Sequence, residues 1–466
     1  MTRPPGASPA RSVPPKPRSR PEGRVGWLRY LALFREDIFA SQPARLYRAR
    51  MAEFRTPFFR SFLVNEPELV RLVLNERPDD FPKSERVGEG LRPLLGNSVF
   101  VTNGETWKRQ RRIIDPAFEG GRLRETYPAM LAAAEAARDR LGRAAAAGPV
   151  EIEEQASFAA ADVIFRTLFS VPITDEVAAR VFHAFRAHQR AQPLLNLGAF
   201  FRLPRWVPRF RGRRARRTAR EIRALITAMT RARMDEIARG AAPDDLATKI
   251  MTTADPETGE RFDTAEMVDQ VAIFFLAGHE TSASALAWAL YLLATHPEAQ
   301  ARVLDEVRAV AGTGLPEFGD LARLAFTRNV FREALRLYPP VPMMVREATR
   351  PERFRDRDVP VGSQIVIAPF FLHRHERHWD NPDAFDPDRF ETEAGRRSAR
   401  LAYLPFSAGP RVCTGAGFAM IEGVLMLAAL VGAFHFAPAE DRPPRPVAHL
   451  TVRALGGIRL VVTPRN

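Results

Sequence analysis

The chain has 466 residues and a single cysteine, Cys413. Because a disulfide needs two cysteines, the fold must be stabilised by its packed core, which suits a reducing compartment such as the cytoplasm. A hydrophobic content of 45% is sufficient for such a core. We expect a single domain over residues 26–466. We expect residues 1–25 to form a disordered tail, since they hold seven prolines and few large apolar side chains.

The residues around Cys413 form a regular pattern, with Phe406, Gly409, Arg411 and Gly415 at fixed offsets from the sulfur. Most isolated cysteines are buried structural thiols. The two glycines let the backbone bend, so that N–H groups can point at the sulfur. One cysteine excludes a cysteine-rich zinc site, although histidine-based sites remain open.

A second motif lies within residues 264–295, which have the spacing of a long helix beginning at the cap Asp263. Ala277 and Thr281 are four residues apart and therefore share one face, with Gly278 and Glu280 between them. Glu280 can relay protons, and the Thr281 hydroxyl can bend the helix or donate a hydrogen bond. A buried stripe of small residues in a core helix would give the same pattern.

Several arginines recur beside acids or aromatic rings. Trp107 and Arg111 lie four residues apart and present two donors on one helical face. Glu333 and Arg336 are three apart, a spacing that often produces a trivial surface ion pair. Arg346 follows an apolar run, and it can bind a carboxylate in a bidentate manner.

Taken together and in this order, the motifs resemble those of the cytochrome P450 family over roughly residues 50–465. The resemblance implies a mainly α fold with minor β-sheet and one long central helix over a haem. It implies haem b (iron-protoporphyrin IX) as cofactor, with Cys413 as its axial iron ligand. It implies proton delivery by Glu280 and Thr281, and a structural triad of Glu333, Arg336 and Arg389. The other residues that it assigns to the cofactor are Trp107, Arg111, Ala277, Gly278, Arg346, Phe406, Arg411 and Gly415.

The activity implied by the resemblance is monooxygenation, in which one oxygen atom of O2 enters a C–H bond of a lipophilic substrate such as a fatty acid or terpenoid. The chain is too short to show a flavin or iron–sulfur domain, so electrons would come from ferredoxin and ferredoxin reductase or equivalent donors. The expected pocket is apolar and includes Phe274, Phe275, Met343, Met344 and Leu450. A peroxygenase, an isomerase and a haem sensor remain alternatives; the Glu280–Thr281 pair argues against the first.

The net charge of +14 comes entirely from two short segments. Residues 1–25 carry +5, and residues 201–220 carry nine arginines without an acid. This local distribution does not form the organised basic face that nucleic-acid binding needs. Prolines, large apolar residues and arginines over 193–217 predict a lid that contacts membrane peripherally, or that folds over its own active site. We expect a monomer.

Apolar periodicity predicts the remaining elements. Strands are expected near 57–64, 343–348, 361–368 and 450–462. Helices are expected at 66–77, 104–115, 123–147, 158–170, 175–192, 214–240, 264–295, 297–311, 326–338 and 416–434.

Overall fold

The computed structural model describes residues 13–23, 25–56, 59–191, 213–440, 442–448 and 450–465. Its centre is the helix α11 (Thr264–Thr295), which begins at a capping box. Asp263 Oδ1 accepts the Glu266 N–H at 2.7 Å, and Glu266 Oε2 accepts the Asp263 N–H at 3.1 Å. These bonds satisfy two backbone donors that a helix start leaves unpaired. Apart from its first turn and an accessible stretch near Ala277, the helix is mostly buried because its sequence is apolar on most sides.

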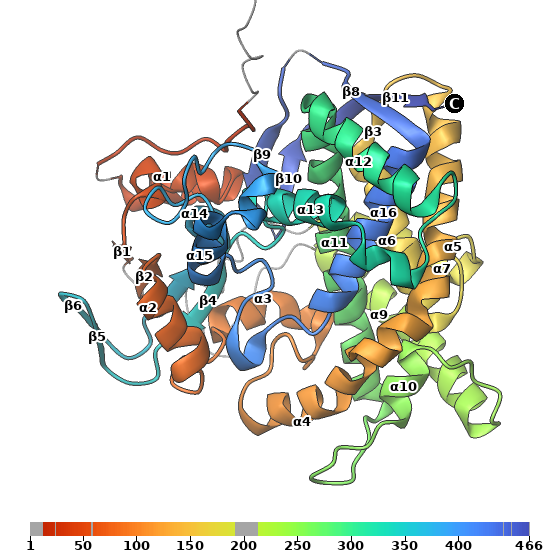
Figure 1. Ribbon diagram of the computed structural model, residues 1–466. Coiled ribbons are helices and arrows are strands. Elements are labelled where there is room, and N and C mark those ends of the chain that lie inside the picture. The colour runs from red at the N-terminus through yellow and green to blue at the C-terminus, as the bar shows by residue number, and fades with distance from the viewer. Residues whose placement is uncertain are drawn as a thin grey trace, which may run out of the picture.

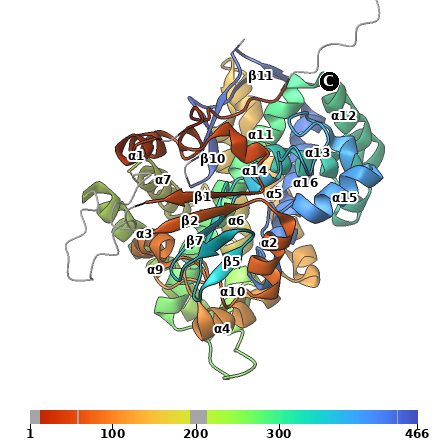
Figure 2. The same cartoon turned by 90° about the vertical axis from the view of Figure 1, so that its left-hand side faces the viewer.

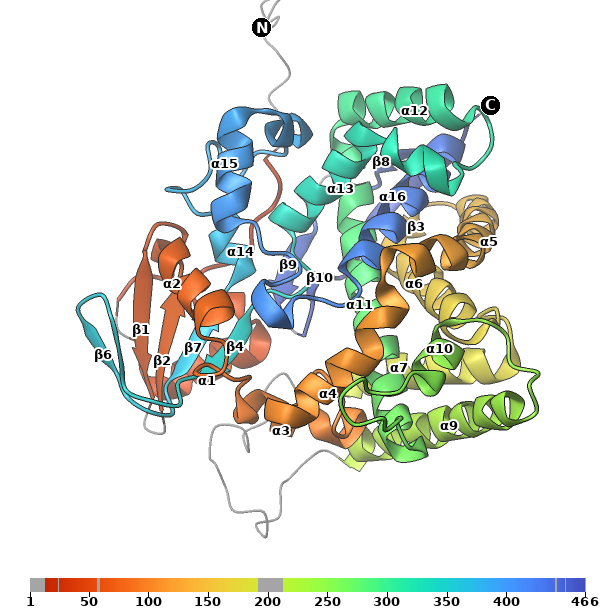
Figure 3. The same ribbon diagram turned by 60° about the horizontal axis from the view of Figure 1, so that its bottom comes forward.

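Helices from both halves of the chain surround α11 (Figure 1). In Figure 3, α5, α6, α7, α9 and α10 lie on one side of the molecule and α12, α13 and α16 at the top. The helices are α1 (Trp27–Glu36), α2 (Pro67–Arg71), α3 (Glu85–Leu95), α4 (Gly104–Ile114), α5 (Gly120–Ala145), α6 (Ile152–Phe169), α7 (Glu176–Ala191), α9 (Arg213–Ala238), α10 (Leu246–Thr252), α11, α12 (Pro297–Ala311), α13 (Ala325–Leu337), α14 (Pro369–Leu372), α15 (Glu393–Ala402) and α16 (Ala416–Ala433).

The strands form four small sheets, of which the largest has the order β1-β2-β7-β4. It faces the viewer in Figure 2 and lies at the left in Figure 3, on the other side of the molecule from α5, α9 and α10. The β2–β7 pair is parallel, and the two outer pairs are antiparallel. The strands are β1 (Met51–Arg55), β2 (Arg60–Val64), β3 (Val150–Glu151), β4 (Met344–Glu347), β5 (Glu352–Phe354), β6 (Arg357–Val359), β7 (Gln364–Ile367), β8 (Phe434–Pro438), β9 (Arg445–Ala448), β10 (Val452–Leu455) and β11 (Arg459–Pro464).

The mainly α architecture with minor β-sheet agrees with the sequence prediction. The expected strand over 450–462 is divided into β10 and β11, because Gly456 and Gly457 turn the chain between them with φ of 88° and 84°. The expected helix over 66–77 is α2 followed by a wider turn, η3 (Leu72–Glu76). The predicted lid over 193–217 lies outside the described residues, apart from the start of α9.

The helix α16 is the only described helix that is long and apolar enough to cross a membrane by length and composition. Most of it is buried within the protein, where it packs beside α5, α11, α12 and α13. Its apolar character is therefore explained by its position in the core.

Residues 13–23 lie against the domain, which differs from the expected disorder through residue 25. Tyr338 Oη donates to the Pro15 carbonyl oxygen at 2.9 Å, and Lys16 forms an ion pair with Asp383. The Arg20 backbone N–H donates to the Gln42 carbonyl at 3.0 Å. Residues 1–12 lie outside the described residues, and the division of the chain at residue 25 stays a prediction.

Candidate active site

The loop before α16 holds the lone cysteine in a closed backbone turn. The Cys413 N–H donates to the Phe406 carbonyl at 2.9 Å, and Val412 N–H donates to the Gly409 carbonyl at 3.0 Å. Gly409 has φ of 69°, and a Cβ at this position would lie 1.9 Å from the Leu74 carbonyl oxygen. Only glycine fits there, so the turn that presents the sulfur depends on it.

The Cys413 side chain is accessible even though protein surrounds it closely. A group that is both accessible and enclosed borders an interior space. Burial raises the pKa of the Cys413 thiol, while the Gly415 N–H and the charges of Arg111 and Lys83 act in the opposite direction. A Cβ added to Gly415 would meet no atom within 4 Å, so open space also adjoins this residue. The loop therefore offers one sulfur ligand toward a cavity.

The centre of α11 borders an interior space too. Ala277 is accessible, although the neighbouring Phe275, Leu276, His279 and Glu280 are buried. Thr281 Oγ1 donates to the Ala277 carbonyl at 2.5 Å, the local bond that bends helices. Ser282 Oγ donates to Glu422 Oε2 at 2.6 Å and ties α11 to α16, the helix that follows Cys413.

Gly278 lies where α11 contacts α6. A Cβ at this position would lie 2.4 Å from Ile164 Cδ1 on α6. The missing side chain therefore allows α11 and α6 to pack closely. Its assignment as a cofactor-binding residue stays a prediction.

Glu280 lies beside Thr281 in sequence, but its side chain pairs with the C-terminal hairpin. It is buried and forms an ion pair with Arg453 of β10. Thr451 Oγ1 donates to Glu280 Oε2 at 3.5 Å. Burial raises the pKa of Glu280, and Arg453 opposes this. His279 is bound to Ser157 Oγ at 2.6 Å, as expected of a structural histidine.

Four basic side chains gather near the cysteine loop, and we call Lys83, Arg111, Arg346 and Arg411 the cation cluster. Arg111 Nη1 donates to the Val412 carbonyl at 2.8 Å and Nε to Asp115 at 2.9 Å. Arg411 donates to the Thr102 carbonyl at 3.2 Å and to Asn103 Oδ1 at 2.8 Å.

Aromatic and strand contacts position this cluster. The Arg411 guanidinium lies over the buried Trp107 ring, 4.0 Å from its centroid. An isolated β-bridge joins Lys83 to Arg346, and Lys83 Nζ donates to the Phe100 carbonyl at 2.7 Å. Sequence reasoning missed Lys83. The one signal for it is composition, since only four of the 69 basic residues are lysines.

The electrostatics of the cation cluster indicate a site for anionic groups. Among the described residues, no carboxylate forms an ion pair with Lys83, Arg346 or Arg411. Burial lowers the pKa of Arg346 to about 10, and burial together with Arg346 lowers that of Arg411 to about 10. Burial and the three arginines hold the pKa of Lys83 well below its usual range. Arg346 is buried, and Lys83 and Arg411 are half-buried. Cations in such surroundings are costly unless an anion joins them, so these residues fit the carboxylates of a haem.

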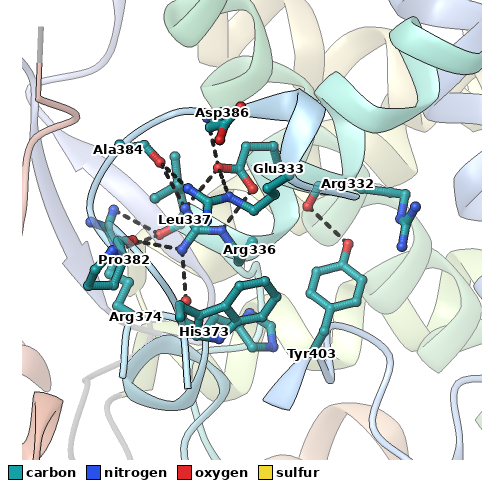
Figure 4. Close-up of polar contacts among 12 residues, drawn as sticks. Arg332, Glu333, Arg336, Leu337, His373, Arg374, Pro382, Ala384, Asp386 and Tyr403 are labelled. Atoms are coloured by element: carbon teal, nitrogen blue, oxygen red, sulfur yellow. Dashed lines mark hydrogen bonds and ion pairs between the residues drawn. The ribbon is translucent and has the colours of Figure 1, made fainter. Parts of the chain in front are cut away.

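The expected triad of Glu333, Arg336 and Arg389 is present, and Figure 4 shows the contacts of Glu333 and Arg336. Glu333 accepts Arg336 Nε at 2.8 Å and Arg389 Nε at 2.9 Å, and all three residues are buried. Arg336 also donates to the carbonyls of His373 and Pro382 at 2.8 and 2.7 Å.

The expected pocket residues are only partly placed together. Phe275 is buried against Phe165, with centroids 4.4 Å apart, so it belongs to the core between α11 and α6. Phe274 is half-buried beside Phe118, which also contacts Phe418 of α16. Met343 packs on the same core, and Leu450 is exposed.

Comparison with known proteins connects this geometry to a family. A sequence model described as Cytochrome P450 matches residues 51–460. The chain is 33% identical to "Cyclooctatin synthase" of Streptomyces melanosporofaciens, over 87% of this chain and 86% of the relative. It is 34% identical to "Cyclooctat-9-en-7-ol 5-monooxygenase" of the same organism, over 88% and 87%. "Cytokinin hydroxylase" of Arabidopsis thaliana is 30% identical, over 86% and 78%.

Solved structures agree on the fold. The crystal structure of the cytochrome P450DA heme domain superposes with a TM-score of 0.82 at 24% identity, covering 97% of this chain and 99% of the other.

Proposed function

The chain belongs to the cytochrome P450 family, whose haem monooxygenases are oxidoreductases, and we propose that it hydroxylates a lipophilic substrate such as a terpenoid or fatty acid. The observation that carries the proposal is the enclosed Cys413 sulfur beside a cluster of buried cations. The similarity to a cyclooctat-9-en-7-ol 5-monooxygenase supports a lipophilic substrate.

Haem, when bound, supplies the chemistry that activates O2 for insertion of one oxygen atom into a C–H bond. Cys413 would hold the haem iron through its thiolate, and the backbone N–H of Gly415 stabilises the anionic form of the sulfur. Arg111, Arg346, Arg411 and Lys83 are the proposed partners of the haem carboxylates, with Trp107 supporting Arg411.

Thr281 and Glu280 on α11 are the proposed proton donors. Thr281 Oγ1 holds its proton toward the Ala277 carbonyl, at the accessible stretch of α11. Glu280 has to break its ion pair with Arg453 before it can pass a proton to the Thr281 hydroxyl. Removing either group should lower the amount of product formed per NADPH consumed, because proton delivery would be impaired.

Electrons come from separate donors in this proposal, either ferredoxin with its reductase or equivalent proteins. We propose a cytoplasmic monomer with peripheral membrane contact through 193–217. The described part of this segment leads into α9, where Arg216, Arg217 and Arg220 are exposed.

The decisive test of the cofactor site is Cys413→His. The ferrous carbon monoxide complex of the wild-type protein should show the red-shifted Soret band that a thiolate ligand produces, and the variant should lose it. Survival of the band in the variant would end the assignment of Cys413.

A second test addresses the substrate. Binding of a homologous series of fatty acids, followed by the haem spin-state shift, should strengthen by about 0.8 kcal/mol per added CH2 group until the pocket is full. Affinity that is independent of chain length refutes a lipophilic pocket.

A further inference from the structure

Glu280 is one of two carboxyl groups that flank Arg453. The second is Glu153 on α6, whose Oε1 accepts the backbone N–H of Ala454 at 2.8 Å. Arg453 and Ala454 are neighbours on β10, and the charge of the Arg453 guanidinium, which pairs with Glu280, also acts on Glu153. The two carboxyl groups come from different helices and meet only at this hairpin.

The other charged groups around this pair are already satisfied. Glu151 accepts the N–H groups of Glu153 and Glu154 at 2.9 and 2.8 Å, and Glu154 pairs with Arg186 at 2.9 Å. Burial, together with Arg453 and Arg186, lowers the pKa of His279 to about 3, so it is neutral. The Arg453 guanidinium pairs with Glu280, and its charge also acts on Glu153. Both carboxyl groups cannot be ionised at low cost, so one proton is retained by the pair.

The hairpin backbone is fixed while the Arg453 side chain reaches solvent. Val452 N–H donates to the Pro340 carbonyl at 2.9 Å, and Ser284 Oγ donates to the Val452 carbonyl at 2.5 Å. The Arg453 side chain remains 41% exposed. The guanidinium can therefore change partner by side-chain rotation alone, without moving the strand.

We propose that Glu153 takes up protons from solvent on a path that reprotonates Glu280, and that Arg453 moves between the two carboxyl groups. This rests on the proposed role of Glu280 as proton donor. When Arg453 leaves Glu280 and approaches Glu153, Glu153 releases its proton and the unpaired Glu280 takes one up. One proton moves inward and one positive charge moves outward, so the net charge of the group is unchanged. Glu153 then takes a proton from solvent as Arg453 returns.

The titration properties agree with this geometry. Burial raises the pKa of Glu153 to about 7, against the opposing effects of the Ala454 N–H and Arg453. The carboxylates of Glu151 and Glu280 act in the same direction as burial. A group with this pKa gains and loses protons readily at neutral pH.

The test compares Glu153→Gln with Glu154→Gln in the holoenzyme. The glutamine at 153 retains an oxygen that accepts the Ala454 N–H, so the fold is kept. Infrared difference spectra across neutral pH should show a titrating carboxyl band in the wild type and in Glu154→Gln, and its loss in Glu153→Gln. Product formed per NADPH should fall several-fold, with a larger solvent deuterium isotope effect, in Glu153→Gln only.

Arg453→Gln is the second variant. Without the shared cation both carboxyl groups should retain protons to higher pH, so the carboxyl band should grow and titrate later. A band unchanged in both Glu153→Gln and Arg453→Gln overturns the proposal, as does normal coupling in Glu153→Gln. If Thr281→Ala uncouples the reaction while Glu153→Gln does not, the path is wrong and the proposed function stands. Absence of the thiolate-type Soret band in the wild type would refute the proposed function itself.

Discussion

The triad and the cation cluster are two groups of basic side chains in the protein interior. They differ in the number of anionic and hydrogen-bonding partners that surround them. In the triad, Glu333 neutralises part of the charge and backbone carbonyls accept the remaining guanidinium protons. In the cation cluster, Arg111 pairs with Asp115, but no carboxylate among the described residues pairs with Arg346, Arg411 or Lys83. Arg346 donates weakly to the Val345 carbonyl, at 3.4 Å, and Lys83 donates to the Phe100 carbonyl. A satisfied group stabilises the fold by itself, whereas an unsatisfied one is prepared for a ligand that supplies the missing charge.

The largest expected effect is a loss of stability when the anion of the triad is removed. Glu333→Gln leaves Arg336 and Arg389 buried without an anion, which should lower the free energy of unfolding by about 3–5 kcal/mol. Urea unfolding followed by circular dichroism measures this. Glu393→Gln is the control, since its exposed carboxylate pairs with Arg397 and its loss should change little. Equal stability of the two variants would show that the triad is not a structural element.

Removing a charge from the cation cluster should not lower the stability of the haem-free protein. Lys83→Met removes a repelled cation, so the haem-free protein should be at least as stable as the wild type. Haem affinity should fall about tenfold, or about 1.4 kcal/mol, because a charge-assisted partner is lost. Transfer of haem to an acceptor protein measures the affinity.

Lys108→Met is the matched control for Lys83, since Lys108 is exposed and pairs with Glu105. It should leave haem affinity unchanged. If Lys83→Met instead destabilises the haem-free protein as strongly as Glu333→Gln, the two regions do not differ in the way described.

Glu422 on α16 is a third buried ionisable group. It lies beside Ser282 and has no basic partner among the described residues. Burial raises its pKa from 4.5 to about 8. The folded state therefore binds the proton more tightly than the unfolded state, and stability falls as pH rises between these two values. The slope attributable to Glu422 should be about 1.4 kcal/mol per pH unit, and Glu422→Gln should remove it. Parallel stability profiles for the two proteins would contradict the burial effect.

Sequence spacing predicted the elements whose signal is local. The loop from Phe406 to Gly415 and the turn from Ala277 to Thr281 each lie within one short segment, and the cap at Asp263 follows from three residues. The spacing could not give the direction of the Glu280 side chain. That direction depends on Arg453, 173 residues away, which no periodic pattern connects to α11.

Lys83 was missed for the same reason. Its place in the site comes from the bridge to Arg346, and a pairing across the chain leaves no mark in the residues around either position. Phe275 was misplaced because adjacent positions on a helix point about 100° apart, and only the packing of α6 shows which of Phe274 and Phe275 faces the core.

The bridge between Lys83 and Arg346 has a consequence for how the protein is made. The residues of the site range from Lys83 to Cys413 in the sequence. The nascent chain therefore contains all of them only after most of it has been synthesised. The amino-terminal half can begin to fold during synthesis, but it presents only part of the charge that captures the cofactor. Haem binding is therefore expected late in the maturation of this chain. In a cell that lacks haem, we expect fully synthesised protein whose cation cluster has no haem carboxylates to bind.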